Sequence, residues 1–147
     1  MRELVNHSTI ATPNLTELCI LTKRKYHTDI TENEIKDMCM ELAGNGAGDI
    51  VVTGLEKNNM LGNAIYSKEN DTFEVIYDKK ILPLRPGTGD VFASIVAGGS
   101  IKNMSLSESV HKAMNFICTC LEKSSEHNIP INDGVCFEEY LYLLHLN

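Results

Sequence analysis

The chain has 147 residues, a formal net charge of −7 and 43% hydrophobic residues. This length is enough for one domain with a buried core, and the composition is ordinary for a globular protein, so extensive disorder is excluded. The acidic balance and the lack of a Lys/Arg cluster argue against a nucleic-acid partner. No apolar run reaches the roughly 18 residues that a membrane helix needs, and residues 1–10 do not resemble a signal peptide, so no membrane partner is expected.

The number and spacing of the cysteines indicate the redox environment of the protein. There are five of them, an odd number without a C-x-x-C pair. This pattern favours buried thiols in a reducing cytoplasm over a disulfide or zinc role. The cysteines concerned are Cys19, Cys39, Cys118, Cys120 and Cys136.

The first third of the chain is expected to be mostly helical. Residues 1–8 are typical of the end of a helix, and residues 8–14 of a short buried strand that Pro13 stops. Helices follow over residues 14–24 and 31–46. In the second of these, Thr31 and Glu34 have the spacing of a capping box at the start, and Gly44 and Gly46 stand at the end.

The middle and last parts of the chain supply strands and then helices. A short apolar strand is predicted to end at Gly54. A hairpin and an extended run follow, and then three helices, the second of which begins with a capping box at Ser105 and Glu108. The ranges are 60–67 and 72–78 for the hairpin, 79–84 for the extended run, and 91–101, 105–127 and 137–146 for the helices.

Short apolar strands that alternate with helices predict an α/β layered fold with a mainly parallel sheet. Only two strands have the fully apolar pattern of a buried strand, and the hairpin is expected at an edge. A complete doubly wound domain has more strands than this. The sequence therefore predicts one domain over residues 1–147 whose sheet is incomplete.

The stretch PGTGD, residues 86–90, is a candidate site. Gly87 and Gly89 permit positive φ and a close approach of the backbone to a ligand. The peptide N–H groups from Thr88 to Val91 open a helix and would lack partners within it, which makes them a site for a phosphate or a developing oxyanion. Asp90 has two interpretations: a general base beside that anion site, or an acidic residue that complements the helix dipole.

Three motifs in order give this chain a family resemblance. PGTGDVFAS resembles the carboxyl-terminal signature of the ribokinase-like sugar and vitamin kinases, which carry G-A-G-D or G-T-G-D there. TPNLTE, with Asn14 and Glu17, has the N-x-x-E spacing of the same superfamily. VVTGLE resembles the strand whose Thr approaches the nucleotide phosphates. The resemblance implies a three-layer ribokinase-like fold.

Within the superfamily, the text resembles the pyridoxal (pyridoxamine, pyridoxine) kinase branch. Hydroxymethylpyrimidine kinases share the TPN text, but they usually carry Cys where Asp90 stands. The tail from residue 129 to 144 also resembles the end of bacterial pyridoxamine kinases. The implied activity is ATP-dependent phosphorylation of the 5′-hydroxymethyl group of a B6 vitamer, in vitamin B6 salvage.

The resemblance also implies residue roles. Asp90 would be the general base, and Gly87, Thr88 and Gly89 would form the anion hole and contact the transferring phosphate. Asn14, Thr53 and Gly54 would contact ATP, while Glu17 would act on Mg²⁺ through water. Capping of the following helix by Asn14, a first-turn role for Glu17 and a plain strand end at Thr53 are the structural alternatives.

Family members are about twice as long, so the chain resembles only the carboxyl-terminal, ATP-side half of such a kinase. We therefore expect a truncated chain that is inactive by itself. An alternative from another class is a nucleotide-binding module without turnover. An incomplete sheet leaves edges and apolar faces uncovered, which favours a homodimer or larger self-association.

Overall fold

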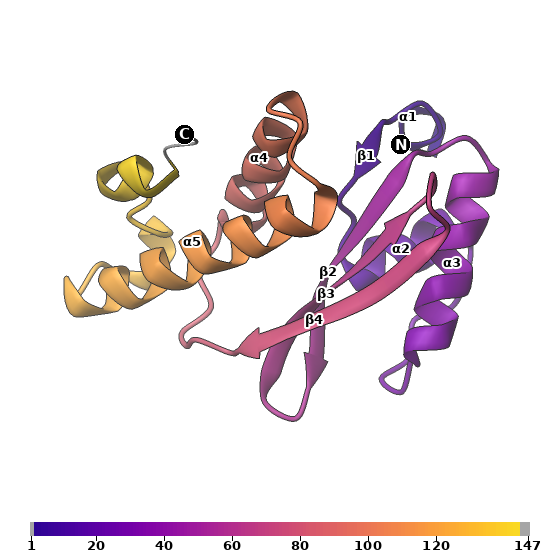
Figure 1. Cartoon of the computed structure of the whole chain (residues 1–147). Helices are drawn as coiled ribbons and strands as arrows, with labels where there is room; N and C mark the ends of the chain where they lie inside the picture. Colours follow the sequence, from indigo (N-terminus) through magenta and orange to yellow (C-terminus); the bar gives the residue numbers. More distant parts are fainter. Residues whose placement is uncertain (1, 145–147) are drawn as a thin grey trace. The chain divides into compact units, whose positions relative to one another are not determined.

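The computed structural model describes residues 2–144. The chain divides into two compact units, Met1–Lys79 and Lys80–Asn147 (Figure 1). The first unit contains the strands, and the second consists of helices. The α/β class is therefore confirmed, with the helices and strands in the predicted order.

The first unit combines three helices with one four-stranded sheet. Its elements are α1 (Arg2–Val5), β1 (Ile10–Ala11), α2 (Leu15–Leu21), α3 (Glu32–Gly44), β2 (Asp49–Lys57), β3 (Met60–Ser67) and β4 (Thr72–Lys79). The strand order is β1-β2-β3-β4, which places the hairpin strand β4 at an edge, as predicted.

The prediction of a mainly parallel sheet is wrong. Only β1 pairs in parallel with β2, through two residue pairs, whereas β2–β3 and β3–β4 are antiparallel. The prediction that β2 ends at Gly54 is also wrong. The register shifts between Val52 and Leu55, and Gly54 has φ 76°, so the glycine forms a bulge and the strand continues to Lys57. A glycine in a strand pattern was mistaken for a stop.

The core of the first unit lies between the sheet and α2 and α3. The apolar face of α3, which consists of Ile35, Met38, Cys39 and Leu42, is at most 3% exposed. Leu18 of α2 and Ile50 of β2 are fully buried in the same cluster. Burial of each such side chain contributes about 1.5–3 kcal/mol. The capping box of Thr31 and Glu34 is confirmed at the start of α3.

The second unit pairs two long helices. These are α4 (Thr88–Ile101) and α5 (Leu106–Glu126), followed by the 3-10 helices η1 (Ile131–Asp133) and η2 (Glu138–Leu144). The capping box of Ser105 and Glu108 is confirmed at the start of α5. Phe116, Cys120 and Leu121 of α5 form a second core cluster with Val135.

One prediction in the second unit needs correction. The predicted closing helix is not an α-helix, because its described residues form the 3-10 helix η2; residues 145 and 146 lie outside the described residues. Residues 80–84, in the predicted extended run, add no further strand and include a cis peptide bond between Leu82 and Pro83. The predicted three-layer arrangement stays a prediction.

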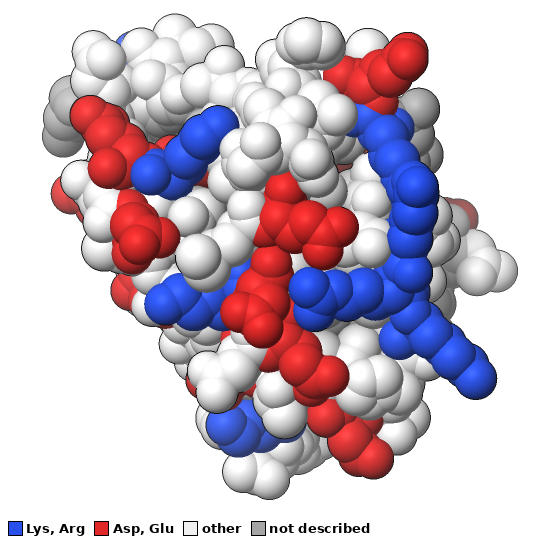
Figure 2. Space-filling view, turned by 90° about the vertical axis from the view of Figure 1, so that its right-hand side faces the viewer, with Lys and Arg blue, Asp and Glu red and all other residues white. Residues whose placement is uncertain are grey.

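The face that Figure 2 shows carries both signs of charge, with a band of Lys and Arg side chains on its right beside a band of Asp and Glu side chains through its middle. Within residues 2–144, no helix has both the length and the apolar character needed to cross a membrane.

Candidate functional site

The start of α4 differs from the starts of the other α-helices of at least seven residues in residues 2–144, which are α2, α3 and α5. Asn14, Thr31 and Ser105 cap α2, α3 and α5 with their side chains, whereas the N-cap of α4 is Gly87, in the left-handed region at φ 84°, with no side-chain cap. The first N–H groups of α4 therefore lack the side-chain acceptor that the other helices have. Such N–H groups and the helix dipole favour an anion.

Two details of the predicted anion hole are wrong. The N–H of Val91 already donates to the carbonyl oxygen of Gly87 at 3.2 Å, so the candidate donors are those of Thr88, Gly89 and Asp90. Of the two glycines of the loop, Gly87 adopts positive φ and Gly89 does not, because Gly89 lies inside the helix. A Cβ at Gly89 would meet no atom within 4 Å apart from its chain neighbours and the backbone of its own helix, so the space beside Gly89 is open.

Asp90 lies in the first turn of α4 and is exposed. The hydroxyl of Ser94 donates to its backbone carbonyl oxygen at 2.8 Å, which leaves the side-chain carboxyl group out of that bond. A carboxyl group at this place complements the helix dipole and is also accessible to a substrate hydroxyl. Both interpretations of Asp90 are compatible with this geometry.

A second group of predicted residues meets in the first unit. The N–H of Thr53 donates to the carbonyl oxygen of Pro13 at 2.9 Å, and Asn14 and Thr53 form an isolated parallel bridge. The positive φ of Gly54 follows directly in the bulge of β2. The turn from β1 into α2 therefore lies beside the bulge, which brings Asn14, Thr53 and Gly54 together. Thr53 lies within β2 and not at a strand end.

Asn14 and Glu17 form a capping box at the start of α2. The N–H of Glu17 donates to Oδ1 of Asn14 at 2.9 Å, and the N–H of Asn14 donates to Oε2 of Glu17 at 2.8 Å. The capping alternative is therefore confirmed for Asn14. Glu17 is exposed, and its Oε1 takes no part in the box.

The carboxylate of Glu17 fits Mg²⁺ only as a ligand that binds through water. Across residues 2–144, no cluster of three or more His, Cys, Asp or Glu side chains could hold a metal ion. One exposed carboxylate fits an ion that keeps most of its waters and shares the phosphates of a substrate, which is the usual state of protein-bound Mg²⁺.

A pocket of about 360 Å³ opens beside the glycine loop in the second unit. One side is formed by Pro86, Gly87 and Val91, and the other by residues 133–138 with Ile129. Gly87 was predicted from the sequence as a site residue, but the lining residues between Ile129 and Glu138 were not. Their only signal was the resemblance of the tail to kinase ends, which assigns no side chain.

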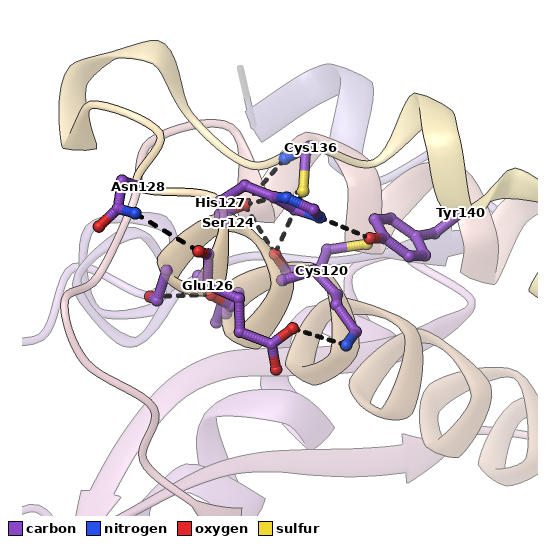
Figure 3. A network of polar contacts seen from close by, with 10 residues as sticks. Cys120, Ser124, Glu126, His127, Asn128, Cys136 and Tyr140 are labelled. Atoms are coloured by element: carbon purple, nitrogen blue, oxygen red, sulfur yellow. Dashed lines mark hydrogen bonds and ion pairs between the residues drawn. The ribbon is translucent and has the colours of Figure 1, made fainter.

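Polar contacts tie the tail to α5 (Figure 3). The hydroxyl of Ser124 donates to the carbonyl oxygen of Cys120 at 2.7 Å and accepts from the N–H of Cys136 at 3.0 Å. Further along, Nε2 of His127 lies 3.2 Å from the hydroxyl of Tyr140. The tail wall of the pocket is therefore fixed to the end of α5 by hydrogen bonds as well as by apolar packing.

Burial controls the thiols near this wall. It raises the pKa of the Cys120 thiol to about 11, with smaller contributions from Cys136 and Glu138. In the first unit, burial raises the pKa of Cys39 to about 12. These thiols are protonated at neutral pH, which agrees with the predicted role as buried, unreactive groups.

Arg85 is a site-adjacent residue that the sequence analysis missed. It stands two residues before Gly87, is only 6% exposed and donates hydrogen bonds to four backbone carbonyl groups. Its signal in the sequence is a single arginine in the apolar, proline-containing run PLRPG.

The predicted site residues thus form two groups. Asn14, Glu17, Thr53 and Gly54 lie in the first unit, and residues 87–90 lie in the second. Their joint use by one nucleotide stays a prediction.

Known proteins resemble this chain over nearly all of its length. The model of a family described as phosphomethylpyrimidine kinase matches residues 1–135. No curated protein matches the chain.

Among solved structures, a protein from Bacteroides thetaiotaomicron assigned as a phosphomethylpyrimidine kinase has a TM-score of 0.93 and 25% identity, over 99% of this chain and 51% of that one. A second crystal form of a Bacteroides thetaiotaomicron protein with the same assignment, which contains pyridoxal, has a TM-score of 0.87 and 24% identity, over 99% of this chain and 52% of that one. The pyridoxal kinase of Lactobacillus plantarum has a TM-score of 0.85 and 20% identity, over 97% and 51%.

These matches confirm the ribokinase-like fold and the resemblance to pyridoxal kinases. The chain spans about half the length of the solved structures that it matches. By its fold and by the match over residues 1–135, the chain belongs to the phosphomethylpyrimidine kinase family.

Proposed function

We propose that the chain is the ATP-side half of a B6-vitamer kinase, which transfers the γ-phosphoryl group of ATP to the 5′-hydroxymethyl group of pyridoxal, pyridoxamine or pyridoxine. The observation that carries this proposal is the start of α4, where a helix without a side-chain cap presents its first N–H groups and an exposed Asp90 stands in the same turn. Anion binding and proton acceptance are the two tasks that phosphoryl transfer to an alcohol requires.

In the proposed step, the carboxylate of Asp90 takes the proton of the 5′-hydroxyl group. The freed oxygen forms a bond to the γ-phosphorus while the bond from that phosphorus to the β–γ bridging oxygen breaks, and ADP leaves with the electron pair. The N–H groups of Thr88, Gly89 and Asp90 hold the transferring oxygens. Because these donors are fixed before the reaction, they stabilise the developing charge without reorganisation.

The residues beside the bulge of β2 serve the phosphates of ATP in this proposal. The side chains of Asn14 and Thr53 and the backbone at Gly54 contact the phosphates, and Glu17 orients waters around the metal. Glu17 would hold Mg²⁺ through water, and the bound ion would supply positive charge that offsets the negative charge of the nucleotide. This arrangement requires that the two units act as one domain, which is part of the proposal.

The choice of a B6 vitamer over a pyrimidine rests on Asp90, since the hydroxymethylpyrimidine kinases usually carry Cys at this place. A crystal form of a Bacteroides thetaiotaomicron protein of the same assignment contains pyridoxal, and a Bacillus subtilis pyridoxal kinase, with a TM-score of 0.69 and 25% identity over 81% of this chain and 44% of that one, forms an ADP complex. Hydroxymethylpyrimidines are the competing class of substrate.

A second candidate, a nucleotide-binding module without turnover, is favoured by the half-length coverage of the relatives. Exposed apolar side chains, such as Leu82, Ile101 and Tyr142, suit self-association into a homodimer or larger assembly, which light scattering would detect. Five thiols and a net charge of −7 suit a cytoplasmic protein that binds no nucleic acid.

A coupled assay of ADP release separates these candidates. The chain is tested with MgATP and pyridoxal, or with a hydroxymethylpyrimidine, beside Asp90→Asn and the control Asp37→Asn, which makes the same charge change at an exposed position of α3. Turnover with pyridoxal that Asp90→Asn reduces by orders of magnitude, with ATP affinity kept, supports the kinase. Binding of ATP without turnover supports the module, and equal rates in both variants contradict the role of Asp90.

A further inference from the structure

Both terminal nitrogens of the Arg85 guanidinium group donate to backbone carbonyl groups. Nη1 donates to Pro130 at 3.0 Å and to Gly134 at 3.1 Å. Nη2 donates to Ile129 at 2.9 Å and to Ser124 at 3.4 Å. Only Nε is buried without a hydrogen-bond partner. Four carbonyl groups from one stretch of chain therefore converge on one side chain.

Two of these carbonyl groups belong to residues that line the pocket beside the glycine loop. Ile129 and Gly134 line the pocket together with Pro86 and Gly87, which follow Arg85 directly. The walls also come close to each other at Gly134: a Cβ added to this residue, whose φ is +82°, would lie 3.2 Å from the carbonyl oxygen of Pro86. The guanidinium group thus joins the residues before the anion hole to the residues across the pocket.

The partners of Arg85 are unusual for a buried cation. No carboxylate within residues 2–144 forms an ion pair with it, although a buried charge is normally paired. Carbonyl oxygens offset the desolvation only in part, since they carry partial charges. Apolar packing could hold two loop segments together without the cost of burying a charge. Four hydrogen bonds from one planar guanidinium group therefore indicate that the position of one segment relative to the other matters.

We propose that Arg85 is a positioning residue, which sets the distance between the glycine loop and the wall formed by residues 129–134 and so holds the pocket open for a nucleotide. The statement that the pocket takes a nucleotide rests on the proposed function. The clamp, by which we mean the hydrogen bonds from Arg85 that join the glycine loop to residues 129–134, does not. A lysine cannot replace the arginine, because one ammonium group has three donors and cannot reach four carbonyl groups in the geometry of the fork.

The experiment uses the whole chain and two readouts. Hydrogen exchange, followed by mass spectrometry, reports on residues 129–138, and a fluorescent N-methylanthraniloyl ATP with Mg²⁺ reports on nucleotide affinity. The variants are Arg85→Ala and Arg85→Lys. The control is Arg24→Ala. The side chain of Arg24 is 41% exposed, and its Nη2 forms an ion pair with Oε2 of Glu41 at 3.3 Å.

We expect faster exchange over residues 129–138 in both Arg85 variants and affinity for the ATP analogue weakened about tenfold or more, as the loss of charged hydrogen bonds implies. Millimolar guanidinium chloride should restore part of the affinity of Arg85→Ala, while sodium chloride at the same concentration should not. Arg24→Ala should match the unaltered chain in both readouts.

Unchanged exchange over residues 129–138 in the folded variants would overturn the clamp. Weaker affinity that guanidinium does not restore would overturn the positioning role, since general destabilisation would then explain the loss. If Arg85→Ala does not fold, Arg85→Lys decides by the same exchange readout. If the unaltered chain does not bind the ATP analogue, the proposed function and the nucleotide part of the inference fail together, whereas exchange still decides the clamp.

Discussion

The close packing of α4 on α5 predicts opposite effects for two adjacent glycines. A Cβ on Gly99 would clash with Oγ of Ser109 and lie 2.8 Å from its Cβ, whereas a Cβ on Gly98 would meet nothing within 4 Å. Both residues are in α4, so replacement by Ala brings the same gain in helix propensity, up to about 1 kcal/mol. Only Gly99→Ala also brings a clash with Ser109.

The magnitude follows from the difference between the two variants. Overpacking of a filled interface costs about 1–3 kcal/mol. Because the propensity gain is common to both, Gly99→Ala should be less stable than Gly98→Ala by about that amount. The clash includes the Cβ of Ser109 as well as the hydroxyl, so rotation of the serine side chain cannot remove it. Gly98→Ala should be at least as stable as the unaltered chain.

Urea unfolding followed by circular dichroism measures these free energies from the midpoint and the slope. A double variant, Gly99→Ala with Ser109→Gly, provides the control, because removal of the serine side chain should recover most of the loss attributed to the clash. Equal stability of Gly98→Ala and Gly99→Ala would refute the close approach of the two helices. A loss in Gly99→Ala that Ser109→Gly leaves unchanged would refute its assigned cause.

Three further predictions concern caps and thiols. Ser105→Ala, which removes the N-cap of α5, should lower the free energy of unfolding in urea by about 1 kcal/mol, whereas Ser107→Ala should change it little. Hydrogen bonds from the hydroxyl and N–H of Ser105 lower the pKa of Glu108 below 4.5, so its contribution is present above that pH and lost as the pH falls through the lowered pKa. The melting temperature of the unaltered chain should therefore exceed that of Glu108→Gln at neutral pH and approach it in acid; a pH-independent gap would contradict the assignment. With pKa values of about 12 and about 11, Cys39 and Cys120 should resist iodoacetamide at pH 8 until the chain unfolds, while the half-buried Cys118 and Cys136 react before them, as peptide mass spectrometry would show.

Local signals in the sequence predicted the helices well. The boxes of Thr31 with Glu34 and of Ser105 with Glu108 involve residues three apart, and each appears in the structure. The hairpin of β3 and β4 was equally local. In these elements the side chains that decide the structure are neighbours in sequence, so a pattern of residue types is sufficient.

The errors involve partners that are distant in sequence. Gly54 ends no strand, because β3 continues to pair with β2 beyond the bulge, and the sheet is mostly antiparallel because β2, β3 and β4 follow one another as a meander. The clamp of Arg85 was missed for the same reason, since its acceptors lie 39 to 49 residues away. No local pattern carries such contacts.

The candidate site divides in the same way. The glycine loop with Asp90 and the pair of Asn14 with Glu17 are short motifs, and the sequence revealed both. The bridge between Asn14 and Thr53 and the partnered N–H of Val91 required the structure. Family resemblance supplied the chemistry that neither motif implies by spacing alone.

The central claim is that the first N–H groups of α4 hold a phosphoryl group. A titration of the ¹⁵N-labelled chain with MgATP, followed by NMR, tests it at the level of single amides. The account predicts the largest shift changes at Thr88, Gly89 and Asp90, with smaller ones beside the bulge of β2. Saturable binding that leaves these three amides unmoved, or shifts confined to other helices, would contradict it.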